Sequence, residues 1–362
     1  MGKGRDNEMM TLRQFASKPE SIPATTSWYL ADLGEARGKQ DLFTKQSPQK
    51  LRVLRENAMI ESAVSSNRIE GVTVDQARVR TILFGKPSLR DRNEEEVRGY
   101  RDALKLIHEQ GNRLPIAEET ILNLHRMCRG EIWDAGKYKE KDGDIIERYP
   151  NGWERVRFKT VRAVKTPPFM KELIERWEQC LLEKWVHPLI AMAASNLDFL
   201  CIHPFRDGNG RVSRLLLLLQ CYHLGYEVGR YISIERLIEQ NKDRYYETLE
   251  QSSEGWHERR HNPWPYLNFV LYTLKTAYKE FEERVGQIAS PKGAKAEMVL
   301  SMIRSQRGEF RLAEIERACH GVGREWIRVL LADLKKSGEV KCKGKGPAAR
   351  WVYKGSKGTT LK

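Results

Sequence analysis

Residues 203–214, HPFRDGNGRVSR, constrain the fold most strongly because they interrupt an apolar sequence with charged and flexible residues. The stretch before them, Leu197–Ile202, is mostly apolar, and the stretch after them, Leu215–Leu219, is entirely so. We expect one helix over residues 189–202 and a second over residues 212–224. Buried charged groups are costly unless they meet a partner, so the polar segment predicts a binding site for a charged ligand.

The residues directly before the second expected helix predict an anion site. Glycines there let the backbone turn its N–H groups toward one point, and the positive end of the helix favours an anion at that point. Two arginines three residues apart can face the same phosphate, an acid can hold a bridging magnesium ion, and a histidine can take a proton from a nucleophile. A helix–helix turn with surface arginines is the alternative, and this combination of residue types argues against it. The residues concerned are Gly208, Asn209 and Gly210, then Arg211 and Arg214, Asp207, and His203.

This segment resembles the signature of the Fic family, HxFx[DE]GNGRxxR, and matches it at every defined position. The resemblance extends from about Glu61 to Tyr272. It implies a mainly α fold, a helical core with a β-hairpin flap. It also implies that the chain transfers AMP from ATP to a hydroxyl of a target protein, or of itself, with pyrophosphate leaving.

The resemblance assigns a role to each residue of the site. His203 would be the general base, and Asp207 would hold Mg²⁺. Tyr246 would contact adenine, although either tyrosine of the pair at residues 245–246 could belong to the core instead. The remaining nucleotide-binding roles fall to the anion hole of Gly208, Asn209 and Gly210, to Arg211 on the phosphates and to Arg214 on the γ-phosphate.

A β-hairpin is expected in residues 144–161, DIIERYPNGWERVRFKTV, because Asn151-Gly152 is a two-residue turn signal between β-branched and aromatic residues. The hairpin is similar to the target-docking flap of the Fic family. Its tip is predicted at Asp144, Ile145 and Ile146, which could pair with an extended target segment by strand addition.

Residues 65–71, SSNRIEG, match the inhibitory pattern [ST]xxxE[GN] of the same family. They lie at the end of a helical pattern expected from Gln49 to Arg68, which Gly71 stops. Ser66 and Glu70 are four residues apart on one helix face, and a carboxylate there can compete with the γ-phosphate for Arg214. An ordinary helix end is the alternative interpretation.

Three regions are predicted: an N-terminal helical region with the inhibitory helix at 1–92, the catalytic core at 93–290 and a small module at 291–362. The last begins after Ser290-Pro291 and has the order helix, helix, helix, β-hairpin, which is typical of a winged helix-turn-helix domain. The net charge of +14 and the excess of Lys and Arg in this module favour DNA binding through residues 293–362. The alternative function is therefore a transcriptional regulator that uses the core as a nucleotide sensor. Contacts are expected from Arg324, Arg328, Lys335 and Lys336, with Trp326 in the core.

Other features bound the function class. HERRH, residues 257–261, fits the HExxH zinc-protease pattern, but Gly255 and Asn262-Pro263 disfavour the required helix, so a loop is expected. The six cysteines are scattered, which suits reduced thiols in a cytoplasmic protein. No apolar run approaches the roughly 20 residues of a membrane span, so no membrane partner is expected, and a homodimer is compatible with the sequence.

Overall fold

The computed structural model describes residues 10–17, 21–44, 48–85, 88–149, 151–288, 299–300, 302–304, 306, 308–319, 322–344, 346 and 349–354. Contacts divide the chain into two compact units, Met1–Glu282 and Glu283–Lys362. This division does not separate residues 1–92 from those that follow, and it falls before residue 290. The three predicted regions therefore stay a prediction.

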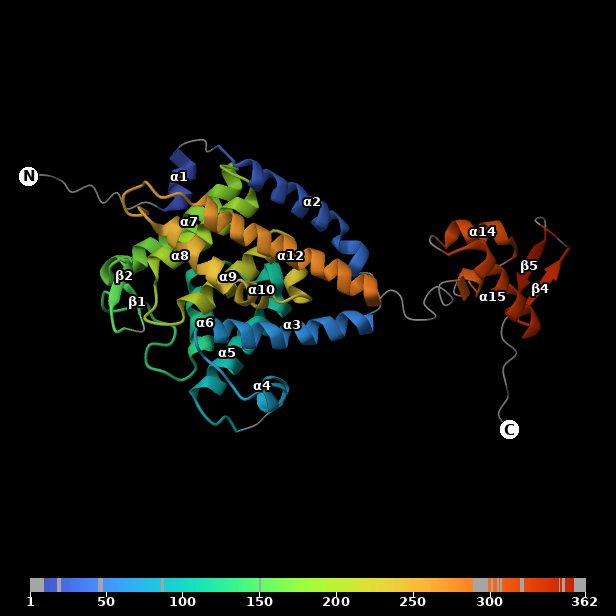
Figure 1. Ribbon diagram of the computed structural model, residues 1–362, viewed down its shortest axis with the longest axis horizontal. Helices are drawn as coiled ribbons and strands as arrows, with labels where there is room; N and C mark the ends of the chain where they lie inside the picture. The colour runs from blue at the N-terminus through green and yellow to red at the C-terminus, as the bar shows by residue number, and fades with distance from the viewer. Residues whose placement is uncertain are drawn as a thin grey trace, which may run out of the picture. The chain divides into compact units, whose positions relative to one another are not determined.

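Helices build the first unit, as the spacing of apolar residues predicts, and the mainly α fold class is confirmed (Figure 1). In the described residues, no helix is long and apolar enough to cross a bilayer. The helices are α1 (Thr11–Ser17), α2 (Ala24–Thr44), α3 (Pro48–Ile69), α4 (Val79–Phe84), α5 (Arg92–Gln110), α6 (Glu118–Arg129), α7 (Thr166–Glu183), α8 (Pro188–Ile202), α9 (Asn209–His223), α10 (Ile234–Gln240), α11 (Lys242–Ser253) and α12 (Trp264–Ile288).

The helices α8 and α9 form the centre of this unit. Every residue of α8 from Leu189 to Ile202 is buried, because the helix is apolar on all faces apart from a few paired polar groups. Helix α9 packs against α8, and α5 and α6 cover it from other sides. The polar segment between α8 and α9 is thereby held inside a rigid helical frame.

The predicted hairpin is confirmed as strands β1 (Ile145–Arg148) and β2 (Glu154–Phe158), which pair antiparallel. Two details of the prediction are wrong. The turn is longer than two residues: Tyr149 and Trp153 still pair, and Gly152 takes the positive φ of 82° that the turn needs. Asp144, Ile145 and Ile146 lie at the start of β1, at the end of the hairpin opposite the turn, because the chain reverses between Tyr149 and Trp153.

In the second unit, a three-stranded antiparallel sheet has the order β3 (Glu309–Arg311), β5 (Arg350–Tyr353), β4 (Val340–Lys343). Helices α14 (Leu312–Ala318) and α15 (Arg324–Lys336) match two of the three expected helices. Of the first expected helix of this module, residues 299–300 and 302–304 are helical, and part of the rest lies outside the described residues. Strand β3 was not predicted, because three residues give no usable periodicity.

The core of this unit gathers apolar side chains from the helical residues 299–300 and 302–304, from α14 and α15 and from the sheet, with Val299, Ile303, Phe310, Ile315, Ile327 and Leu331 among them. The prediction that Trp326 belongs to this core is wrong, since its side chain is 46% exposed. Ile327, Leu331 and Leu334 already fill the buried face of α15, and Trp326 precedes that face by one position, which turns it outward.

Candidate functional site

His203 occupies a strained position at the end of α8. Its φ of 52° is left-handed, and its backbone N–H donates to the carbonyl of Phe199 at 2.9 Å. Such a conformation costs about 1–2 kcal/mol for a residue with a side chain, and strain of this kind is concentrated at functional sites. Burial, aided by the positive charge of Lys139, lowers the pKa of His203 to about 4. The imidazole is therefore neutral at pH 7 and able to accept a proton.

The loop after His203 is held by Asn209. The Asn209 side chain accepts from the backbone N–H of Phe205 at 2.9 Å and donates to the carbonyl of the same residue at 2.8 Å. Gly208, with φ of 86°, caps the helix, so that α9 begins at Asn209 and not at the predicted Val212. Asn209 and Gly210 thus form the first turn of α9, where the free N–H groups point out of the helix end.

A second histidine, His125 of α6, packs against the loop at Phe205 and Asp207. It was not predicted as a site residue. Gly136 donates its backbone N–H to Nδ1 of His125 at 2.9 Å, so the ring proton sits on Nε2, which donates to the carbonyl of Asp207 at 3.0 Å. The ring stacks on Phe205 with centroids 3.8 Å apart. Burial lowers the pKa of His125 to about 4, which keeps this arrangement neutral.

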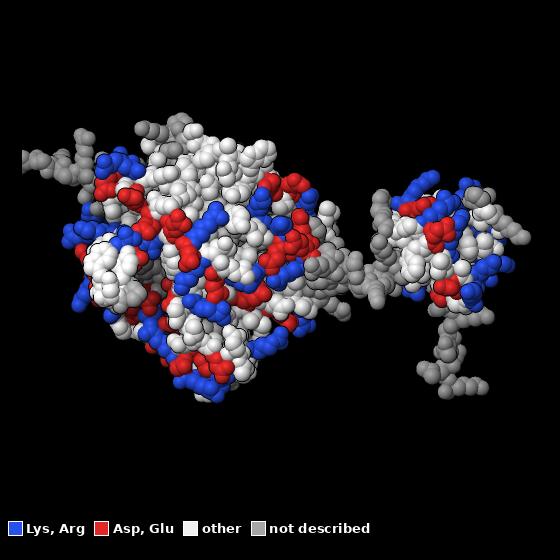
Figure 2. All heavy atoms as spheres, viewed as in Figure 1, with Lys and Arg blue, Asp and Glu red and all other residues white. Residues whose placement is uncertain are grey.

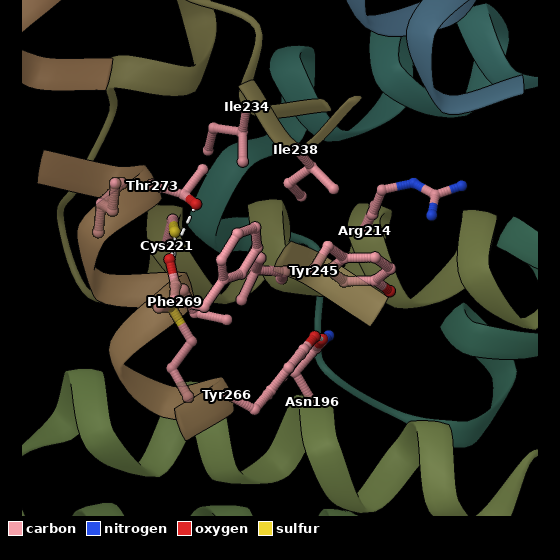
Figure 3. Close-up of a pocket in the computed structure, with 13 residues that line it drawn as sticks. Asn196, Arg214, Cys221, Ile234, Ile238, Tyr245, Tyr266, Phe269 and Thr273 are labelled. Carbon is pink, nitrogen blue, oxygen red and sulfur yellow. Dashed lines mark hydrogen bonds between the residues drawn. The ribbon is translucent and has the colours of Figure 1, made fainter. Parts of the chain in front are cut away.

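The structure brings Ser66 and Glu70 onto Arg214. The Nε of Arg214 donates to the Ser66 hydroxyl at 2.8 Å, and Nη2 donates to the Ser66 carbonyl at 2.9 Å and to Glu70 Oε1 at 2.8 Å. Although burial opposes the charged form, the Glu70 carboxylate raises the pKa of Arg214. Figure 3 shows the guanidinium directed away from the apolar cluster that includes Phe269, with Tyr245 between them. The arginine is thus held at its charged end.

The Glu70 carboxylate also covers the start of α9. A Cβ added to Gly210 would collide with the Glu70 side chain, so the carboxylate lies directly against the backbone of the first turn. Its own side chain is 28% exposed, whereas that of Arg214 is 3% exposed. The acid therefore occupies the positive helix end predicted to receive phosphate.

Arg211 does not share this position with Arg214, contrary to the expectation that both face one anion. Its Nη1 donates to Glu96 Oε2 at 2.6 Å, and its side chain is 1% exposed. Glu96 lies on α5 and was missed in the sequence. It stands four residues before Tyr100 and seven before Ala103, both buried. This helical spacing of an acid with apolar residues was the available signal.

A cavity of about 180 Å³ adjoins these groups. Its walls come from α11, from the hairpin and from the ends of α8 and α3. Of the predicted nucleotide-binding residues, Gly210 and Tyr246 line it. Arg157 lines it too, and its guanidinium lies 5.4 Å from the ring centroid of Tyr246. Its lining residues include Glu70, Ile145, His203, Gly210 and Tyr246.

The other two predicted hairpin residues lie outside this cavity. Asp144 lines a second cavity of about 510 Å³, which also reaches His203. Ile146 is half-exposed and pairs across the hairpin with Val156. His203 thus stands where the two cavities approach each other.

For a metal ion the donor set is small. Within the described part of the chain, no three His, Cys, Asp or Glu side chains gather into a metal cluster. Asp207 is a half-exposed carboxylate, and Mg²⁺ in proteins is commonly held by one or two carboxylates together with substrate phosphates and water. Asp207 therefore fits Mg²⁺ as one ligand of a nucleotide-bound ion.

The HERRH segment lies in turns, as predicted, and His257 and His261 contact Lys159 and Thr11 respectively.

Residues 115–221 match the Fic/DOC family. The chain carries a Fic domain. The match contains the hairpin and every residue from His203 to Arg214, whereas Ser66, Glu70 and Tyr246 lie outside it.

Curated proteins named protein adenylyltransferase Fic are similar to this chain over a region longer than the Fic domain. The protein adenylyltransferase Fic of Drosophila sechellia is 24% identical over 287 residues, 72% of this chain and 54% of that protein. Its counterpart in Drosophila persimilis is 28% identical over 216 residues, 58% of this chain and 39% of that protein. The chain thus spans about half the length, or less, of these curated relatives.

Solved structures share the fold. A Fic family protein from Desulfovibrio desulfuricans superposes with a TM-score of 0.61 at 22% identity, covering 93% of this chain and 98% of that chain. A Fic domain-containing signaling protein from Bacteroides thetaiotaomicron gives a TM-score of 0.60 at 21% identity, covering 71% and 97%. The helical core with its hairpin is therefore that of Fic proteins.

Proposed function

We propose that this chain is a protein adenylyltransferase that transfers AMP from ATP to a hydroxyl side chain of a target protein. The observation that carries the proposal is a neutral, partly buried His203 beside the positive start of α9, with both on one cavity. The curated relatives are named for this activity. A base next to an anion site suits attack by a hydroxyl on a phosphate.

In the proposed reaction, ATP lies in the cavity with its phosphates at the first turn of α9. The ring of His203 takes the proton of the target hydroxyl as its oxygen bonds to the α-phosphorus. The bond from the α-phosphorus to the bridging oxygen breaks, and diphosphate leaves. Backbone N–H groups of Gly208, Asn209 and Gly210 stabilise the developing charge.

Other residues bind and orient the nucleotide. Arg214 holds the γ-phosphate, and Tyr246 packs on adenine beside Arg157, whereas Arg211 stays paired with Glu96. Mg²⁺ bound to Asp207 would neutralise charge on the phosphates. The target segment pairs with the hairpin near Ile145 and Ile146.

Glu70 acts as an inhibitor in this proposal. Its carboxylate lies 2.8 Å from Arg214 and against Gly210, which are the positions assigned to the γ-phosphate and the anion hole. The resting enzyme is therefore slow until Glu70 is displaced.

Two labels of ATP test the reaction type. After incubation with Mg²⁺ and the Glu70→Gly variant, label from α-³²P-ATP should appear on the protein itself or on proteins of a cell lysate, and label from γ-³²P-ATP should not. The reason is that AMP transfer keeps the α-phosphate and releases the other two. Protein labelled from the γ-position would identify a kinase and contradict the proposal, as would the absence of any label.

A second candidate function, DNA binding by residues 293–362, is favoured by exposed cations. Arg324, Arg328, Lys335 and Lys336 of α15 are all exposed, and Figure 2 shows further basic side chains around acidic ones on the visible face of this unit. Arg328 and Lys336 lie near Glu325 and Asp333, at 2.6 and 3.8 Å. These acids weaken the attraction to phosphate, and the exposed Trp326 also suits a protein partner.

Salt dependence distinguishes the two partners. If the unit binds DNA, the full chain should bind a duplex at low salt and lose affinity steeply as salt rises, because phosphate contacts release counterions. Arg324→Ala should reduce the slope of log K against log salt by about 1, and the exposed Lys171→Ala on α7 should leave it unchanged. A gel shift without any binding at low salt would leave only the protein-interaction role.

A further inference from the structure

Three guanidinium groups surround the carboxylate of Asp207. Arg129 Nη1 lies 2.5 Å from Oδ2, Arg211 Nη2 lies 3.6 Å from Oδ1, and Arg92 Nη2 lies 3.8 Å from Oδ2. Oδ1 also accepts the backbone N–H of Gly208 at 2.6 Å. Both carboxylate oxygens therefore have partners in the protein itself.

Arg129 is fixed in this position by buried acids. Its side chain is 4% exposed, and its guanidinium also lies 3.1 Å from Glu96 and 3.6 Å from Asp134. Glu96 in turn binds Arg92 at 2.9 Å and Arg211 at 2.6 Å. Because Glu96 and Asp134 are buried, these contacts hold the Arg129 guanidinium beside Asp207.

The cluster is balanced in charge without a metal. Its three arginines, Arg92, Arg129 and Arg211, face three acids, Glu96, Asp134 and Asp207. A divalent ion at Asp207 adds two positive charges within a few ångströms of three guanidinium groups, and like charges this close repel strongly. Of these groups, Arg92 is half-exposed and can attract the phosphates of a nucleotide directly.

We infer that Arg129 is a built-in counter-ion of Asp207 that weakens the Mg²⁺ site and lets the enzyme bind ATP with little dependence on metal. The inference rests on the proposed function, since it concerns the metal that ATP brings. Arg129 is a positioning residue here: it acts on the metal through Asp207. Outer-shell residues commonly change metal affinity by about 10- to 100-fold, and the positive charge of Arg129 sets the direction as a decrease.

The test measures ATP binding rather than turnover. In a His203→Ala, Glu70→Gly background, the dissociation constant of ATP is determined by calorimetry with EDTA and with Mg²⁺. In the parent, the dissociation constant in EDTA should exceed that in Mg²⁺ by only a few-fold. This ratio, the value in EDTA divided by the value in Mg²⁺, measures how much the metal contributes to binding. Arg129→Gln, which keeps a donor for Glu96 but removes the charge, should raise this ratio about 10-fold.

Matched variants keep the result interpretable. Arg92→Gln, at a half-exposed position 3.8 Å from Asp207, should raise the ratio in the same direction by a smaller factor, and it remains informative if Arg129→Gln does not fold. Arg52→Gln, an exposed arginine of α3 paired with Glu56, should leave the ratio unchanged. Equal ratios in the parent, Arg129→Gln and Arg92→Gln would overturn the inference while leaving the proposed function intact. Absence of ATP binding in every variant would reject both.

Discussion

Replacing His203 should abolish AMP transfer and leave ATP binding largely intact. The general base acts on the target hydroxyl and not on the triphosphate, and its loss should lower the rate by about 100-fold or more. The measurement is α-³²P label incorporated per minute in the Glu70→Gly background, together with the dissociation constant of ATP.

The choice of replacement separates chemistry from strain. Because the φ of His203 is 52°, His203→Ala forces a methyl side chain into the left-handed region, whereas asparagine adopts that region more readily. His203→Asn therefore preserves the backbone but has no side-chain base at neutral pH. If either variant folds and transfers AMP within a few-fold of its parent, His203 has no part in the mechanism.

The pH profile gives an independent check on the same residue. The pKa of His203 is lowered from its ordinary value of 6.5 to about 4, so the base form persists as pH falls until that value is approached. Transfer should therefore change little between pH 8 and pH 5.5 on account of this group. A loss of half the rate near pH 6.5 would mean that His203 titrates normally and that its burial has no effect on catalysis.

The second large effect is expected from Glu70→Gly, which should raise AMP transfer about 100-fold, most visibly as self-labelling. The pair is partly buried, so its loss does more than break a surface salt bridge worth at most about 1 kcal/mol. Arg214 keeps its two bonds to Ser66 when the carboxylate is gone, so the guanidinium stays in place and becomes free for the γ-phosphate. Correct positioning of the triphosphate lowers the activation barrier by several kcal/mol, and this is the source of the expected gain in rate.

Three further variants define the contact. Arg214→Ala in the Glu70→Gly background should remove the gain, because both changes act on one interaction. Ser66→Ala should have a smaller effect than Glu70→Gly. Arg68→Ala breaks a neighbouring ion pair with Glu239 at 2.9 Å, away from Arg214, and should leave the rate at the wild-type level. Equal label per minute from wild type and Glu70→Gly would show that Ser66 and Glu70 are an ordinary helix end.

Local sequence was sufficient for the helical core, the hairpin and the polar loop. Apolar spacing identified helices such as α5 and α8, because a helix must bury one face or, like α8, all of them. Gly71, Gly152 and Gly208 all adopt positive φ at the ends or turns where glycine is favoured. The pairing of Glu70 with Arg214 across 144 residues was anticipated only through the family resemblance, because nothing in the spacing of two distant residues relates them.

Only the tertiary structure decided which buried charges meet. Glu96 and Arg211 are 115 residues apart, and Arg129 reaches Asp207 across 78, so no periodicity could pair them. The same holds for the His125 ring beneath the loop. The local sequence pattern indicates that a residue lies on a buried face. It does not indicate which residue of another element contacts it there. The free energy of a buried charge depends almost entirely on that neighbour. The electrostatics of this site were therefore decided by the tertiary structure, whereas the sequence alone determined the helices and the hairpin that carry the site residues.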